Sequence, residues 1–408
     1  MKLAVLGHTY VHAQNQAKYV ELRRLDCDLE LRLIVPRWSA NDAFHLRYGV
    51  ERHSDLTVGE VVAVGSAFAR SHMTSVYHPI QLGRCLSAFQ PDVIHIDEEP
   101  QAMLTVETVM LRAAVAPRAA LTVFTWDNLL RSRAFPLGDA KRILRRFTLG
   151  RTDVLICGNR DAERLALREG HARRTAVLPQ VGLEPKDHLP GADPAVRHQL
   201  GLEDAVVVGY AGRFLAEKGL RLVFDALAAI PDRPWKLLLV GGGPLESQIL
   251  HEWIPRFPGR IVCIPPVSHA EVPRYLRAMD IFVLNSYEMP AWKEQFGLTL
   301  AQAMLLGRAC VVSDSGALPE VAGGAAMVVA ERSVAELREA LEALLASPAL
   351  RQTLGQRARE RALRHYTNEQ VAVRYHEVFE RAVTARTGLR RSARNAGPNE
   401  APYRAARR

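Results

Sequence analysis

The residues best suited to chemistry lie between residues 285 and 320. Glu294 stands one loop ahead of a stretch whose apolar spacing predicts a helix over residues 297–306. At the start of that helix the free backbone N–H groups of Phe296, Gly297 and Leu298 favour an anion, and the glycine lets it approach closely. A carboxylate beside an anion site suits a ligand that carries both hydroxyl groups and phosphate.

A second candidate anion site lies in the loop that follows an apolar strand predicted over residues 206–210. This loop carries Arg213 and Lys218, and the apolar spacing of the next helix begins at Leu220. A forked guanidinium and a mobile ammonium at the carboxyl end of a parallel strand suit a diphosphate group. The alternative is that both are solvated loop cations, but two candidate anion sites together favour a ligand.

Buried strands and helices alternate in both halves of the chain, which predicts the α/β class. In the second half, residues 309–312 form an apolar run typical of a parallel strand covered on both faces. In the first half, short apolar runs separated by helical stretches predict another Rossmann-like sheet. These runs are residues 2–6, 31–35, 93–96, 121–124, 154–157 and 176–178. Two such domains would face each other across a central cleft.

The same pattern predicts the domain boundaries. A Rossmann-like first domain would occupy residues 1–188 and a Rossmann-like second domain residues 189–367, because prolines and a glycine interrupt structure between them. Residues 368–384 would form a helix with one apolar face. Residues 385–408 contain Arg, Gly, Pro and Asn with almost no large apolar side chains, so we expect a basic, disordered tail there.

The second half resembles the donor-binding domain of the retaining glycosyltransferase family four (glycosyl transferases group 1), whose fold is called GT-B. Six ordered motifs carry the resemblance: Gly212-Arg213 with Lys218-Gly219, residues 240–244 (VGGGP), residues 272–286, Glu294-Gln295-Phe296-Gly297, Ala303-Met304 with Gly307, and residues 316–320. The resemblance implies that the first domain binds the acceptor and the second binds the nucleotide sugar. It also implies that the last helix crosses back to the first domain and that the cleft closes about a hinge.

The resemblance implies a role for each matching residue. Arg213 and Lys218 would hold the diphosphate of a nucleotide sugar, and Glu294 would contact hydroxyl groups of the transferred sugar. The donor-binding set would also include Gly212, Gly243, Phe296, Gly297, Leu298 and Gln302. The alternative for Gly243 is a tight turn between strand and helix, since residues 240–244 lack the spacing of a dinucleotide fingerprint.

Gln302 is a departure from the family pattern. The family carries a second glutamate eight residues after the first, where it usually binds the ribose hydroxyls, and this chain has Gln302 there. An amide oxygen still accepts a hydrogen bond from a hydroxyl, but it lacks the charge that roughly doubles the strength of such a bond. We therefore expect a weakened or altered ribose contact, and the identity of the donor stays open.

Candidate acceptor-binding residues follow three predicted strands of the first domain, where ligands of doubly wound sheets bind. They are His8 and Tyr10 after the first strand, Glu98 and Glu99 after residues 93–96, and Trp126, Asp127 and Asn128 after residues 121–124. The alternatives are a well-packed loop, a solvated edge and a core aromatic, respectively. Many relatives place a histidine at the end of the third of these strands, where this chain has Phe124 or Thr125, so no general base is assigned.

Composition agrees with a two-domain enzyme. The chain has 408 residues, 48% of them hydrophobic, and five scattered cysteines without metal-ligand spacing. We expect reduced thiols, no membrane span, no signal peptide and a cytoplasmic location, with no bound metal and no cofactor besides the nucleotide sugar as a substrate.

The formal net charge of +9 is concentrated in two segments. They are a predicted helix with Lys141, Arg142, Arg145, Arg146 and Arg151, and the tail with Arg386, Arg390, Arg391, Arg394, Arg404, Arg407 and Arg408. Such faces can bind anionic lipid, which would place the protein at the inner face of the cell membrane, or they can simply be solvated. We expect no nucleic-acid partner.

The sequence therefore indicates a hexosyltransferase-type glycosyltransferase that moves a sugar to a hydroxyl of a glycan, a lipid-linked glycan or a small molecule. The resemblance implies retention of the anomeric configuration and a role in polysaccharide or glycoconjugate biosynthesis. Two alternatives stay open: a nucleotide-sugar epimerase of the GT-B fold, and a non-catalytic relative that only binds nucleotide sugar.

Overall fold

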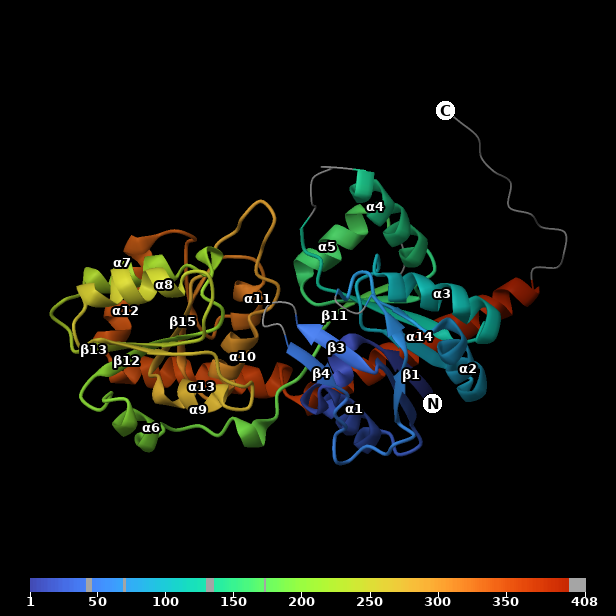
Figure 1. Cartoon of the computed structure of the whole chain (residues 1–408), viewed down its shortest axis with the longest axis horizontal. Coiled ribbons are helices and arrows are strands. Elements are labelled where there is room, and N and C mark those ends of the chain that lie inside the picture. Colours follow the sequence, from blue (N-terminus) through green and yellow to red (C-terminus); the bar gives the residue numbers. More distant parts are fainter. Residues whose placement is uncertain (42–45, 69–70, 130–135, 172–173, 396–408) are drawn as a thin grey trace.

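In the computed structural model the chain forms two α/β domains joined side by side (Figure 1). The structure describes residues 1–41, 46–68, 71–129, 136–171 and 174–395. Each domain is built on one parallel sheet with helices packed on its two faces. The α/β class and the GT-B arrangement of two Rossmann-like domains, expected from the sequence, are confirmed.

The first domain contains a seven-stranded sheet with the order β11-β10-β9-β8-β1-β2-β5. Every neighbouring pair in it is parallel. The strands are β1 Lys2–Leu6, β2 Glu30–Pro36, β5 Val61–Val64, β8 Val93–Ile96, β9 Ala120–Thr125, β10 Val154–Cys157 and β11 Arg174–Val177. Six of these strands coincide with the apolar runs of the sequence, and β5 at the sheet edge was not anticipated.

The helices of the first domain connect these parallel strands. They are α1 Ala13–Leu25, α2 Pro79–Phe89, α3 Met103–Val115, α4 Pro136–Leu149 and α5 Arg160–Arg168. Two short antiparallel ribbons are added to the fold, β3 Trp38–Asn41 with β4 Leu46–Gly49 and β6 Ser66–Ala67 with β7 Val76–Tyr77.

The second domain contains a six-stranded parallel sheet with the order β14-β13-β12-β15-β16-β17. Its strands are β12 Val206–Ala211, β13 Trp235–Val240, β14 Ile261–Ile264, β15 Ile281–Leu284, β16 Ala309–Ser313 and β17 Met327–Val329. Numbered within the domain, the order is 3-2-1-4-5-6, which is the Rossmann order. The first sheet has the same order with one further strand, β11, at its edge.

The helices of the second domain include the two elements that the sequence placed next to the candidate site, α7 and α10. All of them are α6 Pro194–Gln199, α7 Leu220–Ala228, α8 Glu246–Gln248, α9 Val272–Ala278, α10 Leu298–Leu305, α11 Leu318–Ala322, α12 Val334–Ala346 and α13 Pro348–His365. Single turns extend α8 as far as Arg256. The central strands are buried along their whole length, as their apolar runs require for a sheet covered on both faces.

The last helix, α14 Asn368–Asn395, returns to the first domain, as expected. Its Tyr375 and Phe379 are buried in the same core as Leu3 and Tyr19 of that domain. In Figure 1 this helix runs in red across the first domain.

The predicted disordered tail was placed too early, because α14 continues to Asn395. Residues 386–395 include Arg, Leu and Ala, which favour helix, and an existing helix extends at little cost. Arg386 also donates to the carbonyl oxygen of Pro117 and lies 3.7 Å from a carboxylate oxygen of Asp153, so it binds the first domain. The rest of the predicted tail, residues 396–408 with Arg404, Arg407 and Arg408, lies outside the described residues.

The two connections between the domains lie against each other. Leu183, in the outgoing segment, pairs with Thr367, and its carbonyl oxygen accepts from the backbone N–H of Asn368 at 2.9 Å. Gly182 has no room for a side chain, since a Cβ there would lie 2.5 Å from the Cα of Asn368. The pair of connections forms the narrow region about which the domains could rotate.

Two expectations from composition can be compared with the structure. All five cysteines are unpaired. Within the described ranges, no helix has both the length and the apolar character needed to cross a membrane.

Candidate active site

The donor-side residues meet at the point where the strand order of the second sheet reverses. Strands β12 and β15 are neighbours there, and the helices that follow them leave on opposite faces of a doubly wound sheet. Arg213 and Lys218 follow β12, and Glu294 lies on the long loop after β15. The topology therefore brings together two motifs that are far apart in the sequence.

Gly219 allows the two loops to approach closely. Its φ is +70°, and a Cβ at this position would lie 1.9 Å from the carbonyl oxygen of Asn285. The loop after β12 is thereby pressed against the end of β15, and the backbone N–H of Tyr287 donates to the carbonyl oxygen of Glu217 at 2.9 Å. Position 219 therefore requires glycine, both because other residues rarely adopt a positive φ and because a side chain would overlap Asn285.

Glu294 is the centre of the donor-side cluster and is only 6% exposed. Its Oε2 accepts from Lys218 Nζ at 2.7 Å and from Ser286 Oγ at 2.8 Å. No donor among the described residues reaches its Oε1, so this oxygen can accept from a ligand hydroxyl. Lys218 also lies 4.7 Å from the centre of the Trp292 ring. Sequence reasoning predicted both charged residues but not that they pair with each other.

Arg213 differs from Lys218 in being exposed. The part of the chain that the structure describes offers its guanidinium no hydrogen bond or ion pair, whereas its carbonyl oxygen is fixed by Tyr210 Oη at 2.7 Å. The side chain is therefore anchored at its base and has a complete set of free donors. That arrangement fits the predicted contact with a diphosphate.

The start of α10 has the predicted geometry. Gly297 has a φ of +80° and precedes the first helical residue, Leu298. The backbone N–H groups of Phe296, Gly297 and Leu298 have no acceptor within the described ranges, and they open beside Glu294. Such a helix start favours an anion.

Three further donor-side predictions fall near this cluster. Gly212 and Gly243 both adopt positive φ, and a Cβ on Gly243 would lie 2.9 Å from the carbonyl oxygen of Phe214. This geometry explains Gly243 by a tight turn without excluding a ligand contact. Gln302 lies on α10, is 3% exposed, and its side-chain amide has no hydrogen bond to any described residue.

On the first domain, His8 and Glu98 occupy the corresponding reversal of strand order, between β1 and β8. Both the backbone N–H and Nδ1 of His8 bind Glu98 Oε1, the former at 2.9 Å. Burial lowers the pKa of His8, but the Glu98 carboxylate, the hydrogen bond to it and Asp97 outweigh burial and raise the pKa above its ordinary value. The ring of His72 stacks on that of His8, with centroids 5.3 Å apart.

Tyr10 is buried, so the structure favours the packed-loop alternative for it. The side chain is 0% exposed and its hydroxyl accepts from Tyr19 Oη at 3.1 Å. Its ring also lies against the ammonium of Lys18, 5.3 Å away. The sequence did not reveal this because a tyrosine after a strand can point either outward or inward.

Glu99 binds the protein instead of projecting toward a ligand. Its carboxylate accepts from Thr125 Oγ1 at 2.6 Å and from the backbone N–H of Trp126 at 2.8 Å. Burial and the charge of Asp127 raise the pKa of Glu99 to about 7. Glu99 therefore holds the loop after β9 in place.

Trp126 packs where the two domains meet. Its Nε1 donates to Gln180 Oε1 at 3.0 Å, and its ring lies between Phe124 and Phe296, with centroid distances of 5.0 Å and 5.9 Å. The structure thus gives Trp126 a packing role, which was the alternative reading. Asp127 accepts from Gln101 Nε2 at 3.2 Å.

The loop that carries Glu294 is held by the first domain. Asn128 Nδ2 donates to the carbonyl oxygen of Glu294 at 3.1 Å, and Asn159 Nδ2 donates to that of Gln295 at 2.8 Å. Lys293 Nζ lies 2.8 Å from Asp161 Oδ2. We call these three contacts the interdomain clamp. Asn128 was a sequence candidate for a polar contact, whereas Asn159 and Asp161 were missed, since at sequence level they look like the first residues of a helix.

The described part of the chain contains no group of three His, Cys, Asp or Glu side chains placed to hold a metal ion.

Comparison with known families gives a match to the second domain. The family model described as glycosyl transferases group 1 matches residues 205–347, which include Arg213, Lys218, Glu294 and Gln302. The match lies within the domain in which the sequence motifs were found.

Curated relatives agree with the family model. The chain is 27% identical over 202 residues to a 2-deoxystreptamine glucosyltransferase of Streptomyces kanamyceticus, covering 47% of this chain and 50% of that protein. It is 29% identical over 264 residues to a D-inositol 3-phosphate glycosyltransferase of Corynebacterium jeikeium, covering 59% and 60%. The chain spans about half the length of the curated relatives it matches.

Solved structures support the fold over the whole molecule. A sucrose-phosphate synthase from Thermosynechococcus elongatus superposes with a TM-score of 0.68 at 19% identity, covering 94% of this chain and all of that chain. Anabaena HepE in complex with UDP gives a TM-score of 0.69 at 16% identity, covering 93% and 100%. At these identities the likeness shows the fold alone.

Proposed function

We propose that this protein is a glycosyltransferase of group 1 and transfers a hexose-type sugar from a nucleotide-diphosphate sugar to a hydroxyl group of an acceptor. The observation that carries this proposal is the cluster of Glu294, Lys218 and Ser286 beside the exposed Arg213 and the start of α10. A carboxylate for sugar hydroxyls and several donors for a diphosphate meet at the reversal of the strand order, where such ligands bind.

The reaction breaks the bond between the anomeric carbon and the terminal phosphate oxygen and forms a bond from that carbon to the acceptor oxygen. The nucleoside diphosphate leaves with the electron pair of the broken bond, and its terminal phosphate oxygen takes up the proton that the acceptor hydroxyl loses. Arg213 stabilises the charge that develops on the leaving diphosphate. Glu294 accepts a hydrogen bond from the sugar and orients it, and Lys218 holds this carboxylate in place through its 2.7 Å hydrogen bond while adding positive charge to the site.

The acceptor would approach from the first domain, where His8 and Glu98 are the polar pair at the corresponding strand ends. With the domains held together, water is excluded from the reacting carbon, which limits hydrolysis of the donor. Family resemblance supports retention of configuration and a role in the synthesis of polysaccharide or another glycoconjugate. A cytoplasmic site of action, at the inner face of the membrane when the acceptor is lipid-linked, is part of this proposal.

Nucleotide release with a panel of nucleotide sugars and acceptors tests the proposal. Because a structure with the same fold contains UDP, uridine-diphosphate sugars come first in the panel. Transfer with release of nucleoside diphosphate, and an anomeric configuration equal to that of the donor by NMR, would support it. Isomerised nucleotide sugar without an acceptor would favour an epimerase. Binding without any turnover would favour the non-catalytic relative, an alternative that the substitution of Gln302 for the family's glutamate keeps open.

A further inference from the structure

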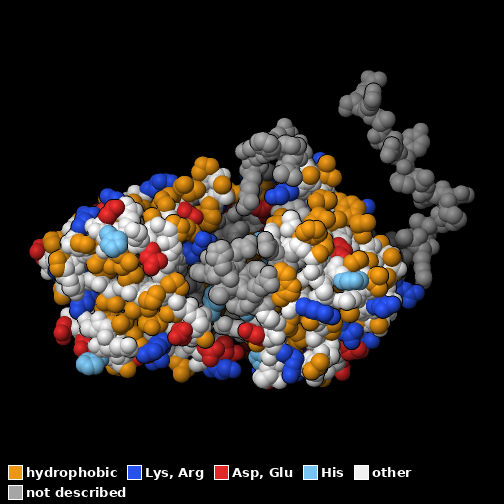
Figure 2. Space-filling model, viewed as in Figure 1, with side chains coloured by type: hydrophobic (Ala, Val, Ile, Leu, Met, Phe, Trp, Pro, Cys, Tyr) orange, Lys and Arg blue, Asp and Glu red, His pale blue; other side chains and the backbone are white. Residues whose placement is uncertain are grey.

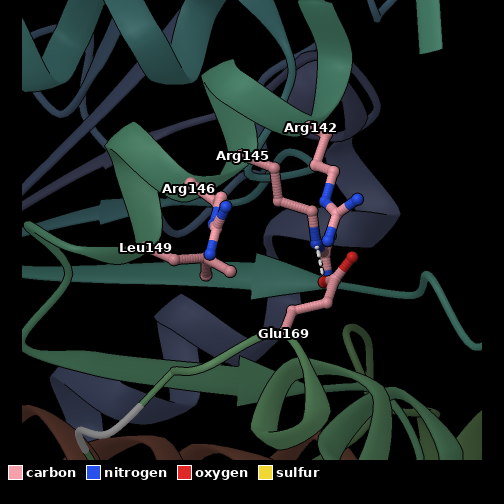
Figure 3. A pocket seen from close by; sticks show the side chains of 5 residues that line it. All are labelled: Arg142, Arg145, Arg146, Leu149 and Glu169. Atoms are coloured by element: carbon pink, nitrogen blue, oxygen red, sulfur yellow. Dashed lines mark hydrogen bonds and ion pairs between the residues drawn. The ribbon is translucent and has the colours of Figure 1, made fainter. Parts of the chain in front are cut away.

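A small pocket lined by three arginines lies in the first domain, away from the donor-side cluster. Its lining residues are Arg142, Arg145, Arg146 and Leu149 of α4, and Glu169 just after α5 (Figure 3). The pocket is small and opens to solvent. The four α4 residues follow the spacing of one helix face, which places them side by side.

The sequence predicted a solvated or lipid-binding basic face on this helix, and Arg145 departs from that prediction. Its side chain is only 6% exposed, and its Nε donates to Glu169 Oε2 at 2.5 Å. Its Nη1 donates to Gln101 Oε1 at 3.1 Å and lies 3.7 Å from Asp127 Oδ2. Its Nη2 is buried without a hydrogen-bond partner. An unsatisfied donor on a buried guanidinium costs free energy, which a bound acceptor would recover.

Arg142 and Arg146 supply charge that the protein leaves uncompensated. Both are exposed, and within the described ranges neither guanidinium has an ion pair or hydrogen bond. Three guanidinium groups of the lining stand against the carboxylates of Glu169, in the lining, and Asp127, beside Arg145, which leaves a formal charge of 3 − 2 = +1. Like charges three and four residues apart on a helix repel each other, and an anion between them would remove this repulsion.

We propose that this pocket, the three-arginine pocket, binds a phosphate group. Planar guanidinium groups recognise phosphate oxygens through paired N–H donors, and the free donors here come from the orphaned Nη2 of Arg145 and from Arg142 and Arg146. Arg145 also connects the pocket to Asp127, on the loop after β9 that meets the Glu294 loop. If the proposed transferase function holds, the bound phosphate is placed to belong to an acidic acceptor.

The test measures binding of inorganic phosphate by calorimetry at constant ionic strength. Because phosphate could also bind at Arg213, the measurement is made on the Arg213→Ala protein, so that its result is independent of the donor site. The variants Arg142→Gln and Arg146→Gln, together, should weaken phosphate binding at least tenfold. Lys141→Gln removes one charge from the same helix outside the pocket and should change the affinity less than twofold. The proposal would be overturned if Arg142→Gln and Arg146→Gln left phosphate binding unchanged, or if Lys141→Gln weakened it equally. It would also be overturned if the Arg213→Ala protein bound no phosphate.

A second arm identifies where the phosphate comes from. Co-sedimentation with phosphatidylglycerol vesicles, compared with phosphatidylcholine vesicles, is measured on the same proteins. Binding to the anionic vesicles that is lost with Arg142→Gln and Arg146→Gln would indicate a lipid headgroup. Phosphate binding without vesicle binding would indicate a soluble phosphorylated ligand instead.

Discussion

At the scale of single residues, the account rests on the carboxylate of Glu294. It is buried, paired with Lys218 and Ser286, and keeps one oxygen free of protein partners among the described residues. A buried carboxylate is tolerated only when it is paired and hydrogen-bonded, and Lys218 and Ser286 supply both interactions. The same pairing fixes the position of the carboxylate and leaves Oε1 available to accept from a ligand hydroxyl.

Replacement Glu294→Gln should keep the shape of this cluster and remove its charge. We expect the transfer rate to fall at least tenfold, since the acceptor oxygen for the sugar hydroxyl loses its charge and its orientation. The affinity for the free nucleoside diphosphate, which does not contain the sugar, should change less than threefold. A kinetic assay measures the transfer rate, and calorimetry measures the affinity for the nucleoside diphosphate. If that affinity fell as much as the transfer rate, Glu294 would be assigned to binding the diphosphate instead.

Glu99 should make stability depend on pH. Its pKa of about 7 in the folded protein lies above the ordinary value of 4.5, so the protonated form is favoured by folding. Its contribution to stability is therefore complete below pH 4.5 and is lost as the pH rises through 7. In Glu99→Gln this part of the pH dependence should disappear. Urea unfolding of both proteins between pH 5 and 8 measures how the free energy of unfolding depends on pH. The same dependence in both proteins would contradict the burial of this carboxylate.

At the scale of elements, the loops at the ends of β12 and β15 depend on glycine. Gly219→Ala would place a Cβ within 1.9 Å of the Asn285 carbonyl oxygen and a non-glycine residue at a φ of +70°. We expect the unfolding free energy to fall by about 2 kcal/mol or more, from the conformational cost and the steric overlap. Gly259→Ala is the matched control, because its φ is also +70° but no atom lies within 4 Å of the added Cβ. Equal losses in the two variants would show that only the backbone conformation matters.

The start of α5 should have two separable roles. Asn159 Oδ1 accepts from the backbone N–H of Ala162 and caps the helix, while Nδ2 donates across the interdomain clamp to Gln295. Asn159→Asp keeps the cap, because the two residues are equivalent at this position, and removes the donor. We expect stability to change by no more than about 1 kcal/mol, nucleotide affinity to stay within twofold, and transfer to fall at least fivefold.

A comparison with Asn159→Ala separates the two roles. This variant should lose the cap, about 1 kcal/mol of stability, in addition to the loss of transfer. Chemical denaturation measures the stability of both variants, and a kinetic assay measures their transfer rates. Unchanged transfer in Asn159→Asp would mean that the clamp does not position the Glu294 loop.

At the scale of the whole molecule, both sheets direct their strand ends toward the junction of the domains. Residues after β9 and β10 contact the loop after β15, and α14 joins the core of the first domain, so the two domains are linked both at the site and behind it. In Figure 2 acidic and basic side chains are interspersed over the face shown, without a large area of one sign. This face therefore presents no broad basic region.

The sequence predicted the architecture well because the apolar patterns that indicate strands and helices are local. Buried parallel strands read as short apolar runs, and the motifs around Arg213 and Glu294 occur on loops whose place follows from strand order. The edge strand β5 was missed although Val61–Val64 is a short apolar run of the same kind as the other strands. The end of α14 was missed because an arginine-rich helix and an arginine-rich coil look alike in composition.

The site was predicted less completely, because the sequence does not show in which direction a side chain on a loop points. Whether Tyr10 or Glu99 faces a ligand depends on how its loop packs, and both turn toward the protein. The Lys218 to Glu294 pair and the contact of Asn159 with Gln295 join residues far apart in the chain, and no local pattern marks either one. Asn159 both caps α5 and donates to the carbonyl oxygen of Gln295, and neither role was predicted.

The most direct measurement of the central claim is binding of a panel of nucleotide sugars to the purified protein by calorimetry, repeated with Arg213→Ala. An exposed arginine of the same domain, replaced in Arg233→Ala, is the control for loss of charge. The account predicts that one donor binds selectively, that Arg213→Ala weakens it at least tenfold, and that the control leaves it unchanged. Failure of every nucleotide sugar to bind, or equal binding by the Arg213→Ala protein, would contradict it.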